Sequence, residues 1–116
     1  MTPEEKQQFI RRKASEHGVP DNEKILWSVH AVKKLRMEGL KKVHVEESLK
    51  TCILAEDYPA VGRPLPDCLV LGFTGNEPIH SVVAIDTDFD RIFIVTVYRP
   101  SYERWEDDWK RRKRKD

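Results

Sequence analysis

The residues in this sequence best suited to acid–base or phosphate chemistry are two histidines, a tyrosine and several cations. They are His30, Lys33, Lys34, Arg63, His80, Tyr98 and Arg99. Histidine titrates near neutrality, and lysine and arginine stabilise the extra negative charge of a reacting phosphate. Tyrosine can stack on an unpaired base or pass a proton. Cleavage of RNA through its 2′-hydroxyl needs a base, a cation and an acid, and this set contains all three types.

Some of these groups are expected to meet at one rim of a β-hairpin. Residues 78–100 read PIHSVVAIDTDFDRIFIVTVYRP, two apolar runs around an acidic turn. If the turn centres on residues 87–90, antiparallel pairing sets His80 opposite residue 97 or 98. His80, Tyr98 and Arg99 are therefore predicted to gather at one end of the sheet. The helix that carries His30 could reach the same rim, although the pattern does not require it.

Each candidate also has a structural interpretation. His30 in the first turn of a helix can bond a loop carbonyl, and His80 beside a valine run can have both ring nitrogens satisfied within the fold. Tyr98 and Trp105 are compatible with core packing. No serine or cysteine lies in a recognisable nucleophile elbow, and no glycine-rich phosphate loop occurs, so hydrolases and nucleotide-binding proteins of those kinds are disfavoured.

No metal site and no cofactor is expected from the spacing of the ligand-type residues. Cys52 and Cys68 form no Cys-x-x-Cys pair, and the histidines are scattered. The set His30, His44 and Cys52 could be assembled on paper, but its spacing is not that of a zinc site. The two cysteines are interpreted as buried free thiols in a reducing compartment.

Size and composition predict one domain of a cytoplasmic protein. The 116 residues are 39% apolar and 35% charged, which is far from a disordered composition. No window approaches the roughly 18 apolar residues of a membrane span. The first residues, MTPEEKQQFIRR, lack the apolar stretch of a signal peptide. Association with a membrane is therefore not expected.

The net charge of +1 hides an asymmetry. Residues 110–115 read KRRKRK, and without residues 110–116 there remain 15 basic and 19 acidic residues, a net charge of −4. A basic tail on a mildly acidic body is typical of a protein that binds a polyanion. The alternative is a solvated, frayed helix end, where positive charge suits the helix dipole.

Helices are predicted before the sheet. Thr2 and Glu5 form a capping box for a first helix that ends near His17. Ser28 caps a second helix that ends at Gly39, after a short extended stretch. A third helix is predicted over residues 45–55, and the proline-rich residues 56–67 are predicted to form a loop.

Strands follow at period two over residues 68–74, 79–86 and 91–99, joined by short turns that favour antiparallel pairing. On the last strand the alternation sets Val97 with Phe93 and Val95, and sets Ile94 on the other face. Residues 101–115 are predicted to form a closing helix, because Tyr102, Trp105 and Trp109 recur at helical spacing.

The predicted fold class is therefore α+β, with N-terminal helices, a three- to four-stranded antiparallel sheet and a C-terminal helix. The predicted organisation is an N-terminal helical extension over residues 1–24, a single domain over residues 25–109 and a basic tail over residues 110–116.

The order of these motifs resembles the domain-of-unknown-function 4258 family over about residues 25–113. The matching segments are SVHAVKKLRMEGL, AEDYP, DCLVLGF, PIHSVVAID and IFIVTVYRPSYERWEDDWKRRK. They contain the His-Ala start of a helix, a Tyr-Pro after the next helix, a Pro-x-His strand start, and a Tyr-x-Pro followed by Trp-Glu. Together these pieces are fairly specific, whereas each alone is not.

The resemblance implies a small α+β domain of the RelE-like toxin type, akin to RelE- and MqsR-like toxins that cleave messenger RNA and are held by an antitoxin. His30, His80 and Tyr98 match the family pattern. Lys34 occupies a position where the family usually has an arginine, so the positive charge is kept but the planar guanidinium, which can bind a phosphate through two hydrogen bonds, is lost. Glu38 also replaces a usual arginine, which puts a phosphate clamp on this helix in doubt.

Two functions follow from the sequence. The first is a toxin-like, metal-independent endoribonuclease with His30, His80 and Tyr98 as proton-transfer residues. Its RNA-binding cations would be Lys33, Lys34, Arg63 and Arg99, and its partners would be RNA and a cognate antitoxin. The second is a non-catalytic module that binds nucleic acid or protein, which the basic tail and the lack of an unambiguous active site favour.

Overall fold

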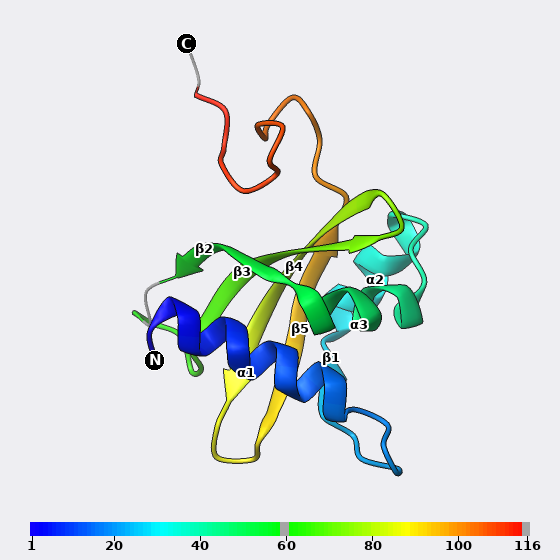
Figure 1. Cartoon of the computed structure of the whole chain (residues 1–116), viewed down its shortest axis with the longest axis vertical. Coiled ribbons are helices and arrows are strands. Elements are labelled where there is room, and N and C mark those ends of the chain that lie inside the picture. Colours follow the sequence, from blue (N-terminus) through cyan, green and yellow to red (C-terminus); the bar gives the residue numbers. More distant parts are fainter. Residues whose placement is uncertain (59–60, 115–116) are drawn as a thin grey trace.

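One mixed β-sheet organises the chain in the computed structural model, which describes residues 1–58 and 61–114 (Figure 1). The helical elements are α1 (Pro3–Glu16), α2 (Val29–Met37), α3 (Lys42–Ser48) and the 3₁₀ turn η1 (Leu49–Thr51). The strands are β1 (Ile25–Trp27), β2 (Ile53–Tyr58), β3 (Asp67–Thr74), β4 (Glu77–Asp86) and β5 (Arg91–Tyr98). Within the described residues they form a five-stranded sheet of order β1-β5-β4-β3-β2. The predicted α+β class is confirmed.

The sheet has more strands than the three to four expected. Strands β2 to β5 pair antiparallel, and the predicted hairpins are present. Strand β1 pairs parallel with β5, with Ile25 opposite Ile92. The short extended stretch before α2 therefore belongs to the sheet, because its apolar side chains and backbone groups find partners along β5.

The third helix is shorter than predicted, and the residues after it form an edge strand. Helix α3 ends at Ser48, whose Oγ donates to the Val45 carbonyl at 2.6 Å. Residues 53–58 pair with β3 instead, where Ile53 lies opposite Leu71. Residues 53–55 continue the helical periodicity of the sequence, but residues 53–58 form a strand because the backbone groups at the edge of β3 offer them hydrogen bonds.

A β-bulge changes which side chains of β5 face the core. Val82 pairs with Thr96 but Val83 pairs with Ile94, so Val95 is the extra residue. Ile94 and Val97 are consequently both fully buried in one hydrophobic core, although strict alternation sets them on opposite faces. Tyr98 alternates with Val97 and faces away from this core, beside His80.

Helix α1 packs on the sheet through Phe9, Ile10 and Ala14, which belong to the hydrophobic core. Its capping box forms as predicted, with the Thr2 side chain accepting from the Glu5 amide. Two lysines of α1 are also buried: the Lys6 ammonium contacts Asp57 and the Lys13 ammonium contacts Asp90 at 2.8 Å. No helix among the described residues is long and apolar enough to cross a membrane.

The predicted C-terminal helix is absent over the described residues 101–114, which fold as a chain of turns (Figure 1). Trp105 forms an isolated antiparallel bridge with Arg112, and the Lys113 amide donates to the Arg104 carbonyl at 2.8 Å. Asp108 Oδ1 accepts from the amides of Lys110 and Arg111, and Trp109 has a positive φ of 60°. These local bonds replace the helical ladder, because an aspartate can bond nearby amides and tolerate a turn. We call residues 101–114 the C-terminal segment.

Candidate functional site

His80 and Tyr98 lie opposite each other on β4 and β5, which confirms the predicted register. The Tyr98 hydroxyl lies 3.1 Å from Nδ1 of His80, and the Trp109 carbonyl lies 2.7 Å from Nε2. A carbonyl only accepts, so Nε2 carries the proton and Nδ1 accepts from the Tyr98 hydroxyl. The fold therefore selects one neutral tautomer of His80.

The His80 ring is fully buried between aromatic side chains. Its centroid lies 5.2 Å from the Tyr98 ring and 4.3 Å from the Trp105 ring, both edge to face. Burial lowers the pKa of His80, and its bond to the Trp109 carbonyl partly opposes this effect. Burial also raises the pKa of Tyr98. The pair is thus a neutral phenol that donates to a neutral imidazole.

An ion pair next to His80 anchors the C-terminal segment to β2. The Arg112 guanidinium donates to both carboxylate oxygens of Glu56, at 2.7 and 3.1 Å. Arg112 also lies 4.8 Å from the centre of the Trp105 ring, and the Tyr58 hydroxyl donates to Glu56 at 3.0 Å. The Arg112 hydrogen bonds lower the pKa of Glu56, so its carboxylate stays charged.

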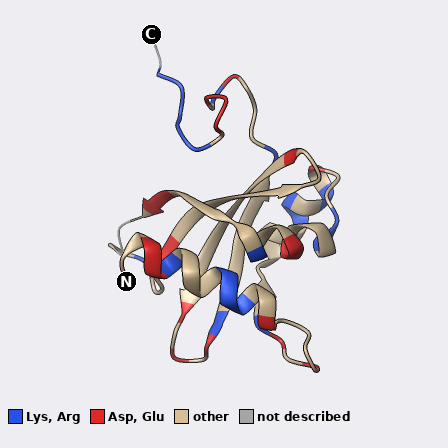
Figure 2. Ribbon diagram, viewed as in Figure 1, with Lys and Arg blue, Asp and Glu red and all other residues tan. Residues whose placement is uncertain are grey.

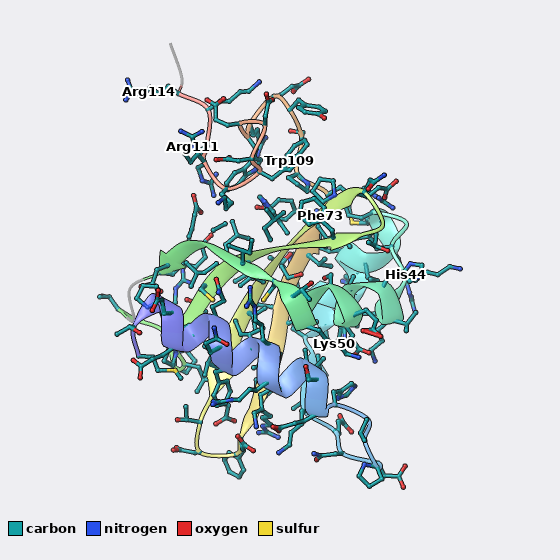
Figure 3. All side chains as sticks on the ribbon, viewed as in Figure 1. His44, Lys50, Phe73, Trp109, Arg111 and Arg114 are labelled. Atoms are coloured by element: carbon teal, nitrogen blue, oxygen red, sulfur yellow. The ribbon has the colours of Figure 1, made fainter. Side chains whose placement is uncertain are left out.

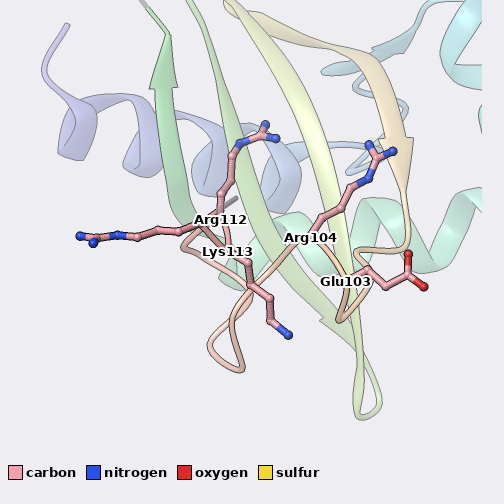
Figure 4. A pocket seen from close by; sticks show the side chains of 5 residues that line it. Glu103, Arg104, Arg112 and Lys113 are labelled. Carbon is pink, nitrogen blue, oxygen red and sulfur yellow. The ribbon is translucent and has the colours of Figure 1, made fainter. Parts of the chain in front are cut away.

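Tyr98 opens into a cation-rich hollow of about 310 Å³, which we call the Tyr98 hollow. It is lined by Lys34, Glu38, Tyr98, Arg99, Ser101, Arg104, Trp105 and Arg112. Four of these eight side chains are cationic and one is acidic. A second hollow of about 330 Å³, the tail hollow, is lined by Glu103, Arg104, Arg112, Lys113 and Arg114 (Figure 4). Arg104 and Arg112 line both, so the two hollows adjoin.

The sequence-predicted residues divide into two groups. Lys34, Tyr98 and Arg99 line the Tyr98 hollow, and His80 lies behind Tyr98. Arg99 is also a structural residue, since its side chain donates to the Glu38 carbonyl at 3.0 Å and pairs with Glu77. It closes the C-terminal end of α2, where unpaired carbonyls need donors.

His30, Lys33 and Arg63 do not line the Tyr98 hollow. His30 is exposed on α2, and its Nε2 lies 3.1 Å from the Thr96 hydroxyl. Lys33 is also exposed on α2. Arg63 pairs with Asp67 and lies 5.4 Å from the centre of the Tyr58 ring, in the loop before β3. The two histidines therefore do not share one pocket.

Glu56, Arg104 and Arg112 are site residues that the sequence reasoning missed. The sequence pattern predicts a loop at Glu56, a helix at Arg104 and a basic tail at Arg112. The available signal was the pair Trp105 and Trp109 between these two arginines, because an arginine side chain often packs on the face of a tryptophan ring.

The remaining ligand-type residues of the described chain form no metal cluster. Residues 1–58 and 61–114 hold no group of three or more histidines, cysteines and carboxylates placed to bind a metal ion. Burial raises the pKa of Cys52 and of Cys68 to about 12 each, so both thiols stay protonated. They are unsuited to act as nucleophiles.

The fold and the site define an α+β domain in which a strand-end tyrosine faces a basic hollow. The model of the family described as "Domain of unknown function (DUF4258)" matches residues 27–99. The chain therefore belongs to this family. No curated protein and no solved structure is significantly similar to the chain.

Proposed function

We propose that this protein is a toxin-like endoribonuclease that cleaves single-stranded RNA at the Tyr98 hollow by a metal-independent route. The observation that carries the proposal is that Tyr98, whose hydroxyl bonds His80, lines a hollow together with Lys34, Arg104 and Arg112. This arrangement supplies a proton acceptor and positive charge at one place. The sequence motifs, which imply kinship with RelE- and MqsR-like toxins, agree with this class of activity.

Phosphate binding is the first step of the proposed function. A phosphodiester in the hollow would contact Lys34 and Arg104. Arg104 forms no ion pair with any other residue that the structure describes. Arg112 adds charge, although Glu56 already holds it by two hydrogen bonds. Charge-assisted bonds from such groups strengthen as negative charge builds up on the phosphate in the transition state.

Proton transfer through Tyr98 is the second step. The 2′-hydroxyl of the substrate gives its proton to the Tyr98 oxygen while Tyr98 passes its own proton to Nδ1 of His80. The 2′-oxygen bonds to phosphorus, and the bond from phosphorus to the 5′-oxygen breaks. The products are a 2′,3′-cyclic phosphate and a 5′-hydroxyl, whose proton comes from the Lys34 ammonium. The Trp109 carbonyl and the nearby Glu56 carboxylate favour the imidazolium that forms.

A reaction test uses a labelled single-stranded RNA in buffer with chelator, compared with the same strand made of DNA. Wild-type protein is expected to cut only the RNA and to leave a 2′,3′-cyclic phosphate. Tyr98→Phe removes the hydroxyl but keeps the ring, and is expected to slow cleavage by roughly 10²- to 10⁴-fold, the usual contribution of a proton-transfer residue. Equal cleavage by Tyr98→Phe would overturn the role of Tyr98.

The second candidate function is non-catalytic binding of nucleic acid at the same hollow. The observation that favours it is the complete burial of His80, with both ring nitrogens occupied, as in a structural histidine. It predicts that wild-type protein binds RNA with a strong salt dependence but never cuts it. The cleavage assay therefore separates the two functions.

A partner antitoxin belongs to the first proposal only. Expression of the wild-type chain is then expected to arrest cell growth, and Tyr98→Phe is expected to relieve the arrest. A small zinc-binding or helix-turn-helix protein encoded beside this gene would be the partner to co-express. Growth arrest that persists with Tyr98→Phe would contradict an effect through RNA cleavage.

A further inference from the structure

We propose that the C-terminal segment forms a second nucleotide subsite, in which the tail hollow holds a phosphate and the exposed Tyr102 ring stacks on a base. The ligand is single-stranded nucleic acid that continues from the Tyr98 hollow. This inference rests on the proposed function, because it takes the first phosphate to lie beside Tyr98.

The two hollows are arranged to hold neighbouring phosphates of one strand. Arg104 and Arg112 line both, so a strand that leaves the Tyr98 hollow enters the tail hollow without crossing an uncharged gap. Lys113 and Arg114 also line the tail hollow, and Glu103 is the one acidic residue among its five lining residues. Figure 4 shows Glu103, Arg104, Arg112 and Lys113. A polyanion therefore gains contacts as it lengthens past one phosphate.

The rings of Tyr102 and Trp109 lie outside the hydrophobic core, and Tyr102 directly precedes Glu103, which lines the tail hollow. The rings of Tyr102 and Trp109 lie 4.5 Å apart between centroids, tilted by 48°. Tyr102 is 65% exposed, whereas Trp105 is 2% exposed and packs on His80. The Tyr102 ring thus contacts the Trp109 ring at a tilt, and Tyr102 stays largely exposed to solvent. Such a ring is a stacking surface for an unpaired base.

Hydrogen bonds hold the segment in this shape without ligand. The Glu106 amide donates to the Arg111 carbonyl at 2.8 Å, and the Trp109 carbonyl accepts from His80 at 2.7 Å. Figure 3 shows Trp109, Arg111 and Arg114 together at the end of the molecule beyond the sheet. A subsite that is already ordered loses less entropy when it binds. Duplexes are excluded as preferred ligands because stacking on Tyr102 needs an unpaired base.

The stacking test compares two probes that cannot be cleaved, fluorescein-labelled dT6 and an abasic strand with the same phosphates, by fluorescence anisotropy. Wild-type protein is expected to bind dT6 more tightly than the abasic strand. Tyr102→Ala is expected to weaken dT6 binding by about 5- to 100-fold and to leave abasic binding unchanged, as loss of one stacked base predicts. Tyr102→Phe keeps the ring and is the matched control. Equal affinity of wild-type protein and Tyr102→Ala for dT6 would overturn the stacking site.

The phosphate test measures the salt dependence of abasic-strand binding. The double variant Lys113→Ala/Arg114→Ala is expected to lower the slope of log affinity against log salt by about 0.7, the value for one phosphate on a single strand. Lys50→Ala is the control, because Lys50 lies on η1 and pairs with Glu47 at 2.9 Å (Figure 3). An unchanged slope would remove the tail hollow from the site. If RNA cleavage persists while both tests fail, only this inference falls; if no RNA is bound at all, the proposed function falls with it.

Discussion

Helix α1 and the C-terminal segment contact the sheet through different kinds of interaction: α1 mainly through apolar packing, and the C-terminal segment mainly through polar contacts. Helix α1 is held by apolar packing, with Ile10 fully buried, and its two buried lysines are paired with aspartates. The C-terminal segment buries only Trp105 among its described residues, and hydrogen bonds and an ion pair hold the rest. Figure 2 shows its lysines and arginines along an exposed stretch of chain. The apolar contacts of α1 stabilise the core, whereas the polar contacts of the C-terminal segment keep its cations at the surface, where a ligand can reach them.

The largest expected effect on stability lies at the N-terminal end. Ile10→Ala removes side-chain volume from the hydrophobic core and is expected to lower the free energy of unfolding by about 2–5 kcal/mol. Urea denaturation measures this, and Gln8→Ala, at an exposed position of α1, is expected to change little. A loss below 1 kcal/mol would mean that α1 is not part of the cooperative core.

Trp105→Ala is expected to act mainly on the C-terminal segment. The free energy of unfolding should fall by about 1–3 kcal/mol. This loss is smaller than for Ile10→Ala because Trp105 is the one buried residue of the described segment, so the rest of the core keeps its contacts. Hydrogen exchange should quicken at the Glu106 and Lys113 amides, which are bonded within the segment, and stay slow in α1. If the amides of α1 lost as much protection from hydrogen exchange as those of the C-terminal segment, the two regions would unfold together, and the proposed difference between them would be wrong.

Acidification is expected to weaken the molecule through His80. Burial lowers the folded-state pKa of His80 below its ordinary 6.5, so the unfolded chain binds more protons as pH falls below about 6.5. Stability is therefore full above that pH and decreases below it, by at most about 1.4 kcal/mol per pH unit for one proton.

Urea midpoints between pH 7.5 and 5.0 measure the His80 effect, and His80→Gln provides the control without a titrating ring. NMR titration of the His80 ring in wild-type protein gives the same answer if the variant does not fold. A pKa at or above 6.5 would show that the ring is not buried as described.

The smallest expected effect comes from the ion pair between the segment and β2. The Arg112 side chain is 57% exposed, so Glu56→Gln should cost no more than about 1 kcal/mol of stability. The same change removes the charge that pairs with Arg112, which lines both hollows, so RNA affinity is expected to rise. Arg112→Ala, in contrast, should lower it. Anisotropy at fixed salt distinguishes the two directions, and a fall in affinity with Glu56→Gln would show that the pair positions Arg112 for binding.

The sequence predicted the parts of this molecule that local patterns determine. The capping box at Thr2, the cap at Ser28 and the hairpin that faces His80 with Tyr98 follow from short-range rules. The bulge at Val95 and the strand β2 do not, because they depend on pairing with a neighbour that is distant in sequence.

At the candidate site, the C-terminal segment was also mispredicted because its fold depends on contacts with residues that are distant in sequence. Its tryptophans recur at helical spacing, but Trp105 packs on His80 and Asp108 bonds the amides that a helix would use. Charge and aromatic content were visible in the sequence, whereas the fold-back that brings Arg112 to Glu56 was not. Residue types were thus predictable at the site, and their convergence was predictable only for His80, Tyr98 and Arg99.

The tautomer of His80 is set by a backbone carbonyl, that of Trp109. Because every amino acid carries this group, replacing the residue at position 109 leaves the acceptor in place as long as the turn keeps its path. The protonation pattern of the imidazole is consequently encoded in the course of the polypeptide. Removing the chain from residue 109 onward is therefore the genetic change that takes this acceptor away and lets the other tautomer form.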